Sequence, residues 1–228
     1  MSLKIDLKIF ALLILFYFTN QLEIYLMIMI FAIIHELGHL LVGLTLGQKP
    51  KEIKINPFGL SILFKFNVDE YNRKIKNGNE LELKKIFIAF AGPITNILLI
   101  IIASITRIDE FMRTLIIASN VVIASFNLLP IYPLDGGRIV KGILHIFLGK
   151  HNSEKMVNDI SIIVTIILTF IASIAIYYFK NISIFLITIY VWYLVLKENK
   201  IYKSKKEMYD VVESIKYNDY VDKNDYIC

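Results

Sequence analysis

Long runs of apolar residues, separated by short charged segments, dominate the pattern along the chain. A membrane-spanning helix needs about 20 predominantly apolar residues, and several segments of the chain meet or nearly meet this length. The pattern therefore predicts an all-α polytopic membrane protein with about six transmembrane helices. The spans are expected at residues 3–19, 22–46, 86–105, 114–134, 160–179 and 182–196.

The segment between the second and third spans, residues 48–85, is more than a polar linker. Apolar residues alternate with others from Ile53 to Phe66, on both sides of the sequence Asn56-Pro57-Phe58-Gly59. This alternation predicts two short strands joined by a turn, a small membrane-associated β-hairpin. Two interpretations stay open: a structural hairpin on the membrane surface, or an edge strand that pairs with an extended substrate. The second makes Ile62 and Phe64 substrate-binding residues.

The first apolar run follows Lys4 and Lys8 and has some features of a signal peptide. A small-residue cleavage site does not follow it, and the second apolar run begins almost at once. We therefore expect the first run to be kept as a membrane span.

The positions of the basic residues predict the orientation, because cytoplasmic loops carry the excess of Lys and Arg. With six spans and the N-terminus inside, 22 of the 25 basic residues fall on the cytoplasmic side. The remaining three are Arg107, Arg113 and Lys180. Both termini are therefore predicted to be cytoplasmic. Residues 1–200 form the six-span domain and residues 201–228 a short cytoplasmic tail.

Composition supports a chain embedded in the lipid bilayer. Hydrophobic residues make up 56% of the sequence and the mean hydropathy is +0.60, whereas soluble proteins are about 45–50% apolar. The net charge is +5, and the charged residues lie between the apolar runs. This position indicates that they determine membrane topology rather than bind nucleic acid. Cys228 is the single cysteine. An intrachain disulfide and a cysteine metal site are thus excluded, and any metal must be held by His and carboxylate groups.

The sequence His35-Glu36-Leu37-Gly38-His39 lies inside the second apolar run. In a helix, His35 and His39 share one face and can both direct a ring nitrogen at one Zn²⁺. Glu36 lies beside them and is the expected general base for an attacking water. A chance match to this short pattern is the alternative. Its position argues against chance, since each charge at the centre of a bilayer costs about 2.5 kcal/mol or more.

A catalytic zinc site needs a third protein ligand and one open position. The other two histidines, His145 and His151, fall in a predicted cytoplasmic helix or loop. Asp135 is the better candidate, because it follows Pro130 and Pro133, which break the fourth span on the cytoplasmic side where His39 is also expected. The alternative is that Asp135 is a helix-capping or turn residue before Gly136.

Together these segments resemble the site-2 protease family of intramembrane metalloproteases. The three signatures of that family are matched in order over about residues 1–200, by HELGH, by FAGPITN at residues 90–96 and by NLLPIYPLDGGR at residues 127–138. The resemblance implies zinc ligands at His35, His39 and Asp135 and a catalytic base at Glu36. It also implies that Asn127 holds the substrate or the developing oxyanion, and that Pro133 shapes the broken helix beside the substrate.

The second signature, which contains Gly92, Pro93 and Asn96, is expected to pack against the active-site helices. Ordinary packing of small residues between helices is an equally good interpretation of that segment.

The same resemblance implies a membrane-associated protein substrate that is cut near the cytoplasmic face. The chain looks most similar to the sporulation proteases that process a precursor sigma factor, which would make such a precursor a substrate and allow for inhibitory membrane-protein partners. One departure is that the tail is too short for the nucleotide-sensing CBS domain that such proteins often carry.

Two other classes of protein remain as alternatives. A prenyl-protein-type endopeptidase needs a downstream glutamate ligand, and the last spans contain none before Glu198. A non-proteolytic metal-binding protein or transporter should place polar residues on several spans, whereas the fifth and sixth carry only Ser, Thr and Tyr.

Overall fold

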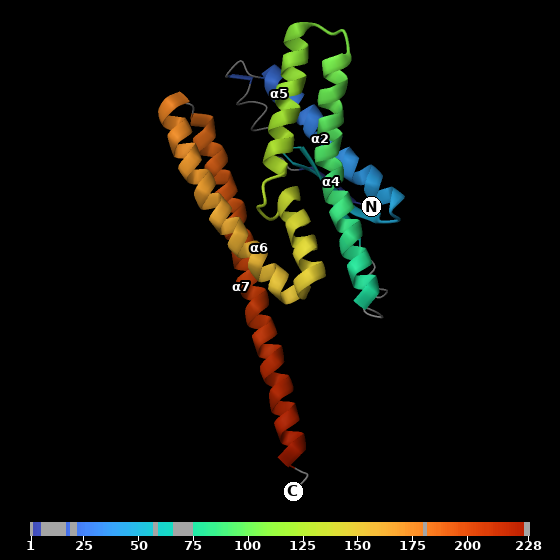
Figure 1. Cartoon of the computed structure of the whole chain (residues 1–228), viewed down its shortest axis with the longest axis vertical. Coiled ribbons are helices and arrows are strands. Elements are labelled where there is room, and N and C mark those ends of the chain that lie inside the picture. The colour runs from blue at the N-terminus through green and yellow to red at the C-terminus, as the bar shows by residue number, and fades with distance from the viewer. Residues whose placement is uncertain are drawn as a thin grey trace. The chain divides into compact units, whose positions relative to one another are not determined.

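The computed structural model describes residues 2–5, 17–18, 22–56, 59–65, 75–179 and 182–225. The fold is mostly helical and contains one small sheet (Figure 1). Contacts divide the chain into two units, one formed by Met1–Pro130 with Leu134–Ser153 and the other by Ile131–Pro133 with Glu154–Cys228. In chain order the elements are β1 (Ser2–Ile5), α2 (Leu22–Thr45), β2 (Lys49–Asn56), β3 (Gly59–Lys65), α4 (Ile75–Ile105), α5 (Glu110–Asn127), α6 (Asp135–Phe179) and α7 (Ile182–Asp225).

Helices α2, α4 and α5 contact one another and form the centre of the first unit. Figure 1 shows α4 and α5 running antiparallel, joined by a short connection. Asp109 caps α5 by accepting hydrogen bonds from the backbone N–H groups of Phe111 and Met112, which satisfies donors that a helix start leaves open. Gly38 lets α2 approach α4 closely, because a Cβ there would overlap the Thr95 side chain.

The hairpin predicted around residues 56–59 is confirmed. Strands β2 and β3 pair antiparallel with Asn56 opposite Gly59. The sheet has a third strand that the sequence pattern did not indicate, since β1 pairs parallel with β2 and the order is β1-β2-β3. The hairpin packs on α2, where the Phe64 ring occupies the space that a side chain at Gly43 would need.

The chain between α5 and α6 follows the predicted break at the two prolines. Helix α5 ends at Asn127, and α6 begins at Asp135. Helix α6 is itself interrupted at Gly149, whose φ of 77° is a left-handed conformation that glycine adopts without strain. The segment of α6 before this break packs against α4 through Ile86, Ala89 and Ile139.

The second unit pairs the later part of α6 with α7. The Trp192 indole N–H donates to the Thr169 hydroxyl at 2.9 Å, and Val191 and Val195 of α7 are fully buried. The backbone N–H of Tyr132 donates to the Ser161 hydroxyl at 3.0 Å. The connection before α6 is thereby tied to this helix pair.

Among the described residues, three helices are long and apolar enough to cross a membrane: Leu22–Thr45, Gly78–Ile105 and Asp135–Tyr178. They correspond to the predicted second, third and fifth spans, to within one residue at the ends of the second and fifth. The count of six is not reached in the described part of the chain. The predicted fourth span is the helix α5, but its polar residues, such as Arg113, Asn120 and Asn127, make it less apolar, and it ends seven residues before the predicted Leu134. The predicted sixth span, residues 182–196, lies in α7.

The prediction that a first span begins at Leu3 is wrong for residues 3–5. These residues form β1, where their backbone pairs with β2 instead of closing helical hydrogen bonds. Tyr17 and Phe18 are helical, and most of the remainder of this predicted span lies outside the described residues. The predicted domain boundary at residue 200 falls inside α7.

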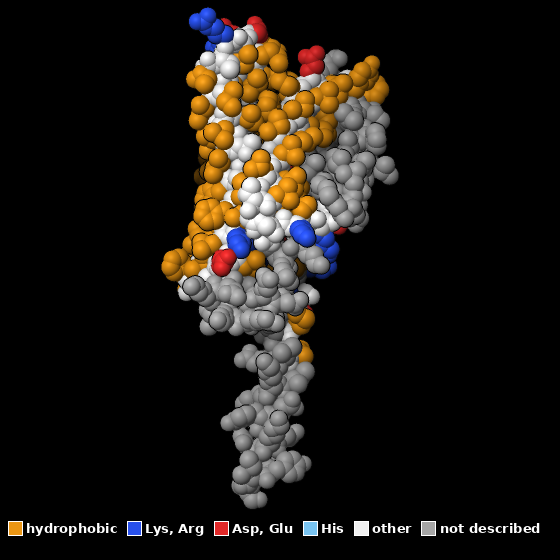
Figure 2. Space-filling view, turned by 90° about the vertical axis from the view of Figure 1, so that its right-hand side faces the viewer, with side chains coloured by type: hydrophobic (Ala, Val, Ile, Leu, Met, Phe, Trp, Pro, Cys, Tyr) orange, Lys and Arg blue, Asp and Glu red, His pale blue; other side chains and the backbone are white. Residues whose placement is uncertain are grey.

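Apolar side chains cover much of the outer surface of the long helices. Ile97, Leu98 and Ile101 of α4 are about half exposed, as are Ile30 and Leu41 of α2. Figure 2 shows a face on which hydrophobic side chains dominate over the described helices. A surface this apolar matches lipid rather than water, since soluble monomers rarely expose continuous apolar patches of this kind.

Candidate metal centre

His35, His39 and Asp135 converge in the interior of the first unit. His35 Nε2 lies 3.2 Å from His39 Nε2, and both nitrogens lie 3.1 Å from Asp135 Oδ2. All three residues are buried, with exposed fractions of 3%, 3% and 4%. Two α2 side chains thus meet a carboxylate from the start of α6, about a hundred residues away in sequence.

The local sequence explains why the two histidines can point the same way. They lie four residues apart on α2, so they occupy one face of the helix. Gly43 continues this face and is also buried. Opposite them, Gly92 of α4 lies so near that a Cβ there would overlap Nε2 of both imidazoles. The glycine therefore leaves the space in which the three polar groups meet.

The other ring nitrogen of each histidine contacts α4. His35 Nδ1 lies 3.1 Å from the side-chain oxygen of Asn96, and His39 Nδ1 lies 2.6 Å from the backbone oxygen of Ile88. Metal-binding histidines in proteins usually donate their second N–H to such an acceptor, which fixes the ring. Both imidazoles are thus held with Nε2 toward Asp135.

Asp135 owes its position to the connection between α5 and α6. Gly136 follows it and packs so tightly that a Cβ would overlap the backbone oxygens of Leu128 and Leu129. The second carboxylate oxygen of Asp135 lies 3.5 Å from the Arg138 guanidinium. One oxygen therefore faces the histidines and the other faces a cation on the next helical turn.

The spacing of the three groups fits a zinc ion. Zinc binds imidazole nitrogen and carboxylate oxygen at about 2.0–2.2 Å in a tetrahedron, whose ligand atoms are then about 3.3 Å apart. The observed separations of 3.1–3.2 Å are close to this value. In the described part of the chain, these residues form the one group of three or more His, Cys, Asp or Glu side chains able to hold a metal ion. Three ligands leave a fourth position for chemistry.

Glu36, the predicted base, is the residue after His35 on α2 and is partly buried. Its carboxyl group interacts electrostatically with His39, Asp135 and Arg138. The structure therefore brings it near the three candidate ligands. This is where a proton acceptor would have to lie.

The other predicted site residues do not belong to this group of three. Asn127 is the last residue of α5, and its amide N–H donates to the Ile123 backbone oxygen at 3.1 Å. Pro133 is partly buried in the connection before α6. On β3, Ile62 is buried, whereas the half-buried Phe64 packs beside Gly43, four residues beyond His39 on the same face of α2.

His145 is not near the metal centre. Its ring nitrogen lies 3.7 Å from Glu82, whose carboxylate also binds Lys85 at 2.6 Å. This cluster links α4 to the first part of α6. The sequence-based preference for Asp135 over His145 agrees with this arrangement.

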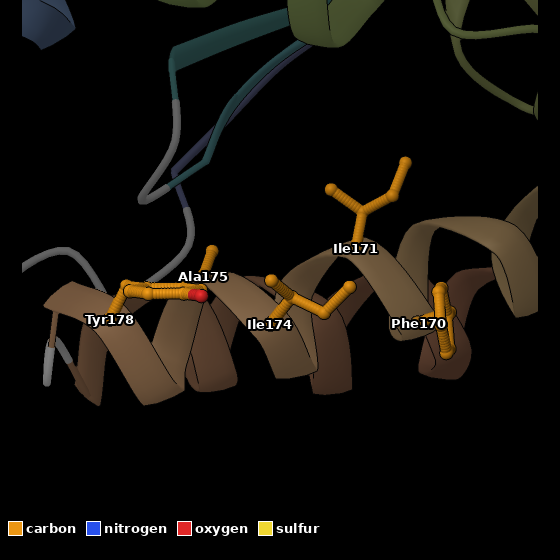
Figure 3. A pocket seen from close by; sticks show the side chains of 5 residues that line it. All are labelled: Phe170, Ile171, Ile174, Ala175 and Tyr178. Carbon is orange, nitrogen blue, oxygen red and sulfur yellow. The ribbon is translucent and has the colours of Figure 1, made fainter.

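An apolar hollow of about 550 Å³ on α6 contains none of the predicted site residues (Figure 3). Phe170, Ile171, Ile174, Ala175 and Tyr178 line it. The hollow offers no carboxylate or imidazole to a metal.

The contacts of Asn96 and Ile88 were not predicted from the sequence. Asn96 was expected only to pack against the active-site helices, yet it is fully buried and contacts a candidate ligand directly. Its polarity in the middle of an apolar helix was the available signal. The Ile88 contact is made by a backbone oxygen, which every residue has, so the sequence could not indicate it.

Comparisons with known proteins agree with this geometry. The sequence profile of Peptidase family M50 matches residues 103–172, which include Asp135. A zinc metalloprotease of Methanocaldococcus jannaschii is 25% identical over 209 residues, covering 88% of this chain and 55% of that protein. Stage IV sporulation protein FB of Bacillus subtilis is 30% identical over 127 residues, covering 54% of this chain and 40% of that protein. The chain thus spans about half the length, or less, of these curated relatives.

The fold also resembles a solved structure, that of a site-2 protease from Methanocaldococcus jannaschii. The TM-score is 0.60 at 22% sequence identity, and the match covers 86% of this chain and 89% of the other. At this level of identity the match concerns the fold.

Proposed function

We propose that this chain, a member of the site-2 protease family within peptidase family M50, is an intramembrane zinc metalloprotease that hydrolyses a peptide bond of a membrane-associated protein. The observation that carries the proposal is the convergence of His35, His39 and Asp135 at zinc-ligand spacing inside apolar helices. Ionisable groups buried in a membrane are costly, so they usually mark a functional site.

In the proposed reaction, His35, His39 and Asp135 would hold zinc, and the bound zinc would supply Lewis acidity. Glu36 accepts the proton of that water and passes it to the leaving amine. The Asn127 amide, at the end of α5, supplies a hydrogen-bond donor to the substrate or to the developing oxyanion.

The substrate must present an extended segment, because the peptide groups of an intact helix are already hydrogen-bonded. Strand β3 is an outer strand of the described sheet, and Phe64 packs on α2 beside the face that carries His39. An unwound segment that adds to β3 would therefore run close to the metal centre. Ile62 and Phe64 are the residues proposed to shape this path, and the family resemblance adds Pro133 as a proposed substrate-binding residue.

The charge distribution supports cleavage near the cytoplasmic face, with both termini in the cytoplasm. One relative is named as a sporulation protein. The resemblance to sporulation proteases makes a precursor sigma factor one candidate substrate and inhibitory membrane proteins candidate regulators. A non-proteolytic metal-binding protein is the alternative that the experiment must separate from a protease.

The test is co-expression with a candidate membrane-associated precursor, followed by measurement of precursor cleavage and of zinc in the purified chain. Glu36→Gln should keep about one zinc per chain and lose cleavage, because it lacks only the proton acceptor. Asp135→Ala should lose both zinc and cleavage. Glu23→Gln, which changes an exposed glutamate of the same helix, is the matched control and should behave as wild type.

Full cleavage by Glu36→Gln would contradict the proposed protease. If wild type bound zinc yet left every membrane-associated precursor uncut, the metal-binding alternative would be favoured. An unchanged zinc content in Asp135→Ala would mean that Asp135 is a turn or helix-capping residue and not a zinc ligand.

A further inference from the structure

Asn96 is a fully buried amide on α4 that contacts one of the proposed zinc ligands. Its exposed fraction is 0%, and its Oδ1 lies 3.1 Å from Nδ1 of His35. We propose that Asn96 is the positioning residue of His35, accepting its Nδ1–H and so presenting the Nε2 lone pair to zinc. This inference rests on the proposed function, because it concerns a ligand of the proposed zinc site.

The chemistry of a neutral imidazole makes the contact directional. One ring nitrogen carries hydrogen and the other carries the lone pair that a metal can bind. An amide oxygen only accepts hydrogen bonds, so a bond to Nδ1 requires that Nδ1 carries the hydrogen. Nε2 is then the free acceptor, and this is the atom 3.2 Å from His39 Nε2 and 3.1 Å from Asp135 Oδ2.

The orientation of the Asn96 amide is fixed from its other end. Its Nδ2 donates to the backbone oxygen of Asn120 on α5 at 3.4 Å. Turning the amide over would bring its oxygen against that carbonyl oxygen and its N–H₂ group against Nδ1 of His35, and both contacts would lose their hydrogen bond. The α5 backbone therefore sets which end of Asn96 faces the histidine.

The side chain of Asn120 takes no part in this contact. It is also 0% exposed, and its Nδ2 donates to the Ile116 backbone oxygen at 2.8 Å, within α5. The contact from Asn96 goes to the backbone of Asn120 and not to its side chain. A line of hydrogen bonds thus runs from α5 through Asn96 to His35, which joins three helices at the proposed zinc site.

The test measures zinc affinity of the purified full chain by competition with a chelator, together with the visible spectrum of the cobalt-substituted protein. Asn96→Leu removes the acceptor and should weaken zinc binding by about 10–100-fold, the usual effect of losing such a partner, and should alter the cobalt spectrum. Asn96→Asp keeps an acceptor oxygen for Nδ1 but loses the Nδ2 donor to Asn120, so it should recover part of the affinity that Asn96→Leu loses.

Asn120→Leu is the matched control, because it replaces an equally buried asparagine while leaving the backbone oxygen that Asn96 uses. It should keep the zinc affinity and cobalt spectrum of wild type. Thermal unfolding of each variant separates a general loss of packing from a loss of metal.

Wild-type zinc affinity in Asn96→Leu would overturn the inference and leave the proposed function intact. An equal loss of affinity in Asn96→Asp would also overturn it, since packing rather than hydrogen-bond acceptance would then be the cause. Failure of the wild-type chain to bind zinc would instead contradict the proposed function itself.

Discussion

At the scale of single residues, Gly92 leaves the space in which the two histidine rings meet Asp135. A Cβ on Gly92 would overlap Nε2 of both His35 and His39. These two atoms are the ones that must stay free to bind zinc. Glycine is therefore needed at this position of α4 because it has no side chain, and not because the backbone adopts a special conformation.

Gly92→Ala should lower zinc affinity by about tenfold or more, in the range seen when contacts around metal ligands are disturbed. The added methyl group forces the imidazoles away from Asp135. Alanine is the better helix former by about 1 kcal/mol, so weakening of α4 itself would not explain the loss. Chelator competition on the purified chain is the measurement.

Ser104→Ala, at an exposed position of α4, is the control for substitution in the same helix and should keep wild-type affinity. Unchanged zinc binding in Gly92→Ala would mean that the histidines do not bind the metal through their Nε2 atoms.

Among the elements, the hairpin is the one whose proposed role depends on its place in the sheet. Strand β2 lies between β1 and β3, so β3 carries an outer edge in the described sheet. Phe64 anchors β3 to α2 at Gly43, on the histidine face. The hairpin is thus fixed beside the helix face that carries the histidines, where the proposed strand addition would take place.

A proline at Ile62 or Phe64 should abolish or strongly reduce precursor cleavage while zinc stays bound. Proline removes a backbone N–H and cannot be accommodated within a regular ladder. Cleavage and zinc content of each variant are compared with those of Leu63→Ala, which changes an exposed side chain but no backbone group. Normal cleavage by a folded, zinc-loaded proline variant would show that the substrate does not add to β3 at that position.

For the whole molecule, the distribution of basic residues predicts that both termini face the cytoplasm, which requires an even number of spans. Helices α4 and α5 are joined by a connection that contains Arg107 and is expected on the opposite side. Three sufficiently apolar helices lie in the described residues. The predicted six-span orientation can be tested by labelling cysteines from one side of the membrane.

The native Cys228 is the only cysteine and should react with a membrane-impermeant maleimide only after the cells are permeabilised. Arg107→Cys in a Cys228→Ser background should react in intact cells, because Arg107 is exposed in the connection between α4 and α5. A tag at the N-terminus should share the accessibility of Cys228. Labelling of Cys228 in intact cells would contradict the six-span orientation.

Several features could be read from the sequence because they depend on local spacing. Apolar runs identify the helices α2 and α4, since length and composition alone decide whether a segment suits lipid. The four-residue spacing of His35 and His39 places them on one face, and Glu36 lies next to them. The alternation around Asn56 and Gly59 predicted the hairpin, and the prolines predicted the end of α5 before Asp135.

What only the tertiary structure decided depends on groups that are distant in sequence. Asp135 contacts the two histidines although about a hundred residues separate them in the sequence. A sequence pattern alone does not predict that such distant residues lie 3.1 Å apart. Residues 3–5 form a strand although they begin a predicted helical span. Their backbone hydrogen bonds go to β2, and the presence of such a partner strand is not visible in the local sequence. The acceptors at Asn96 and Ile88 likewise arise from the approach of α4 to α2. The sequence by itself determined which residues could bind a metal, whereas packing decided that they meet around one point and in which orientation.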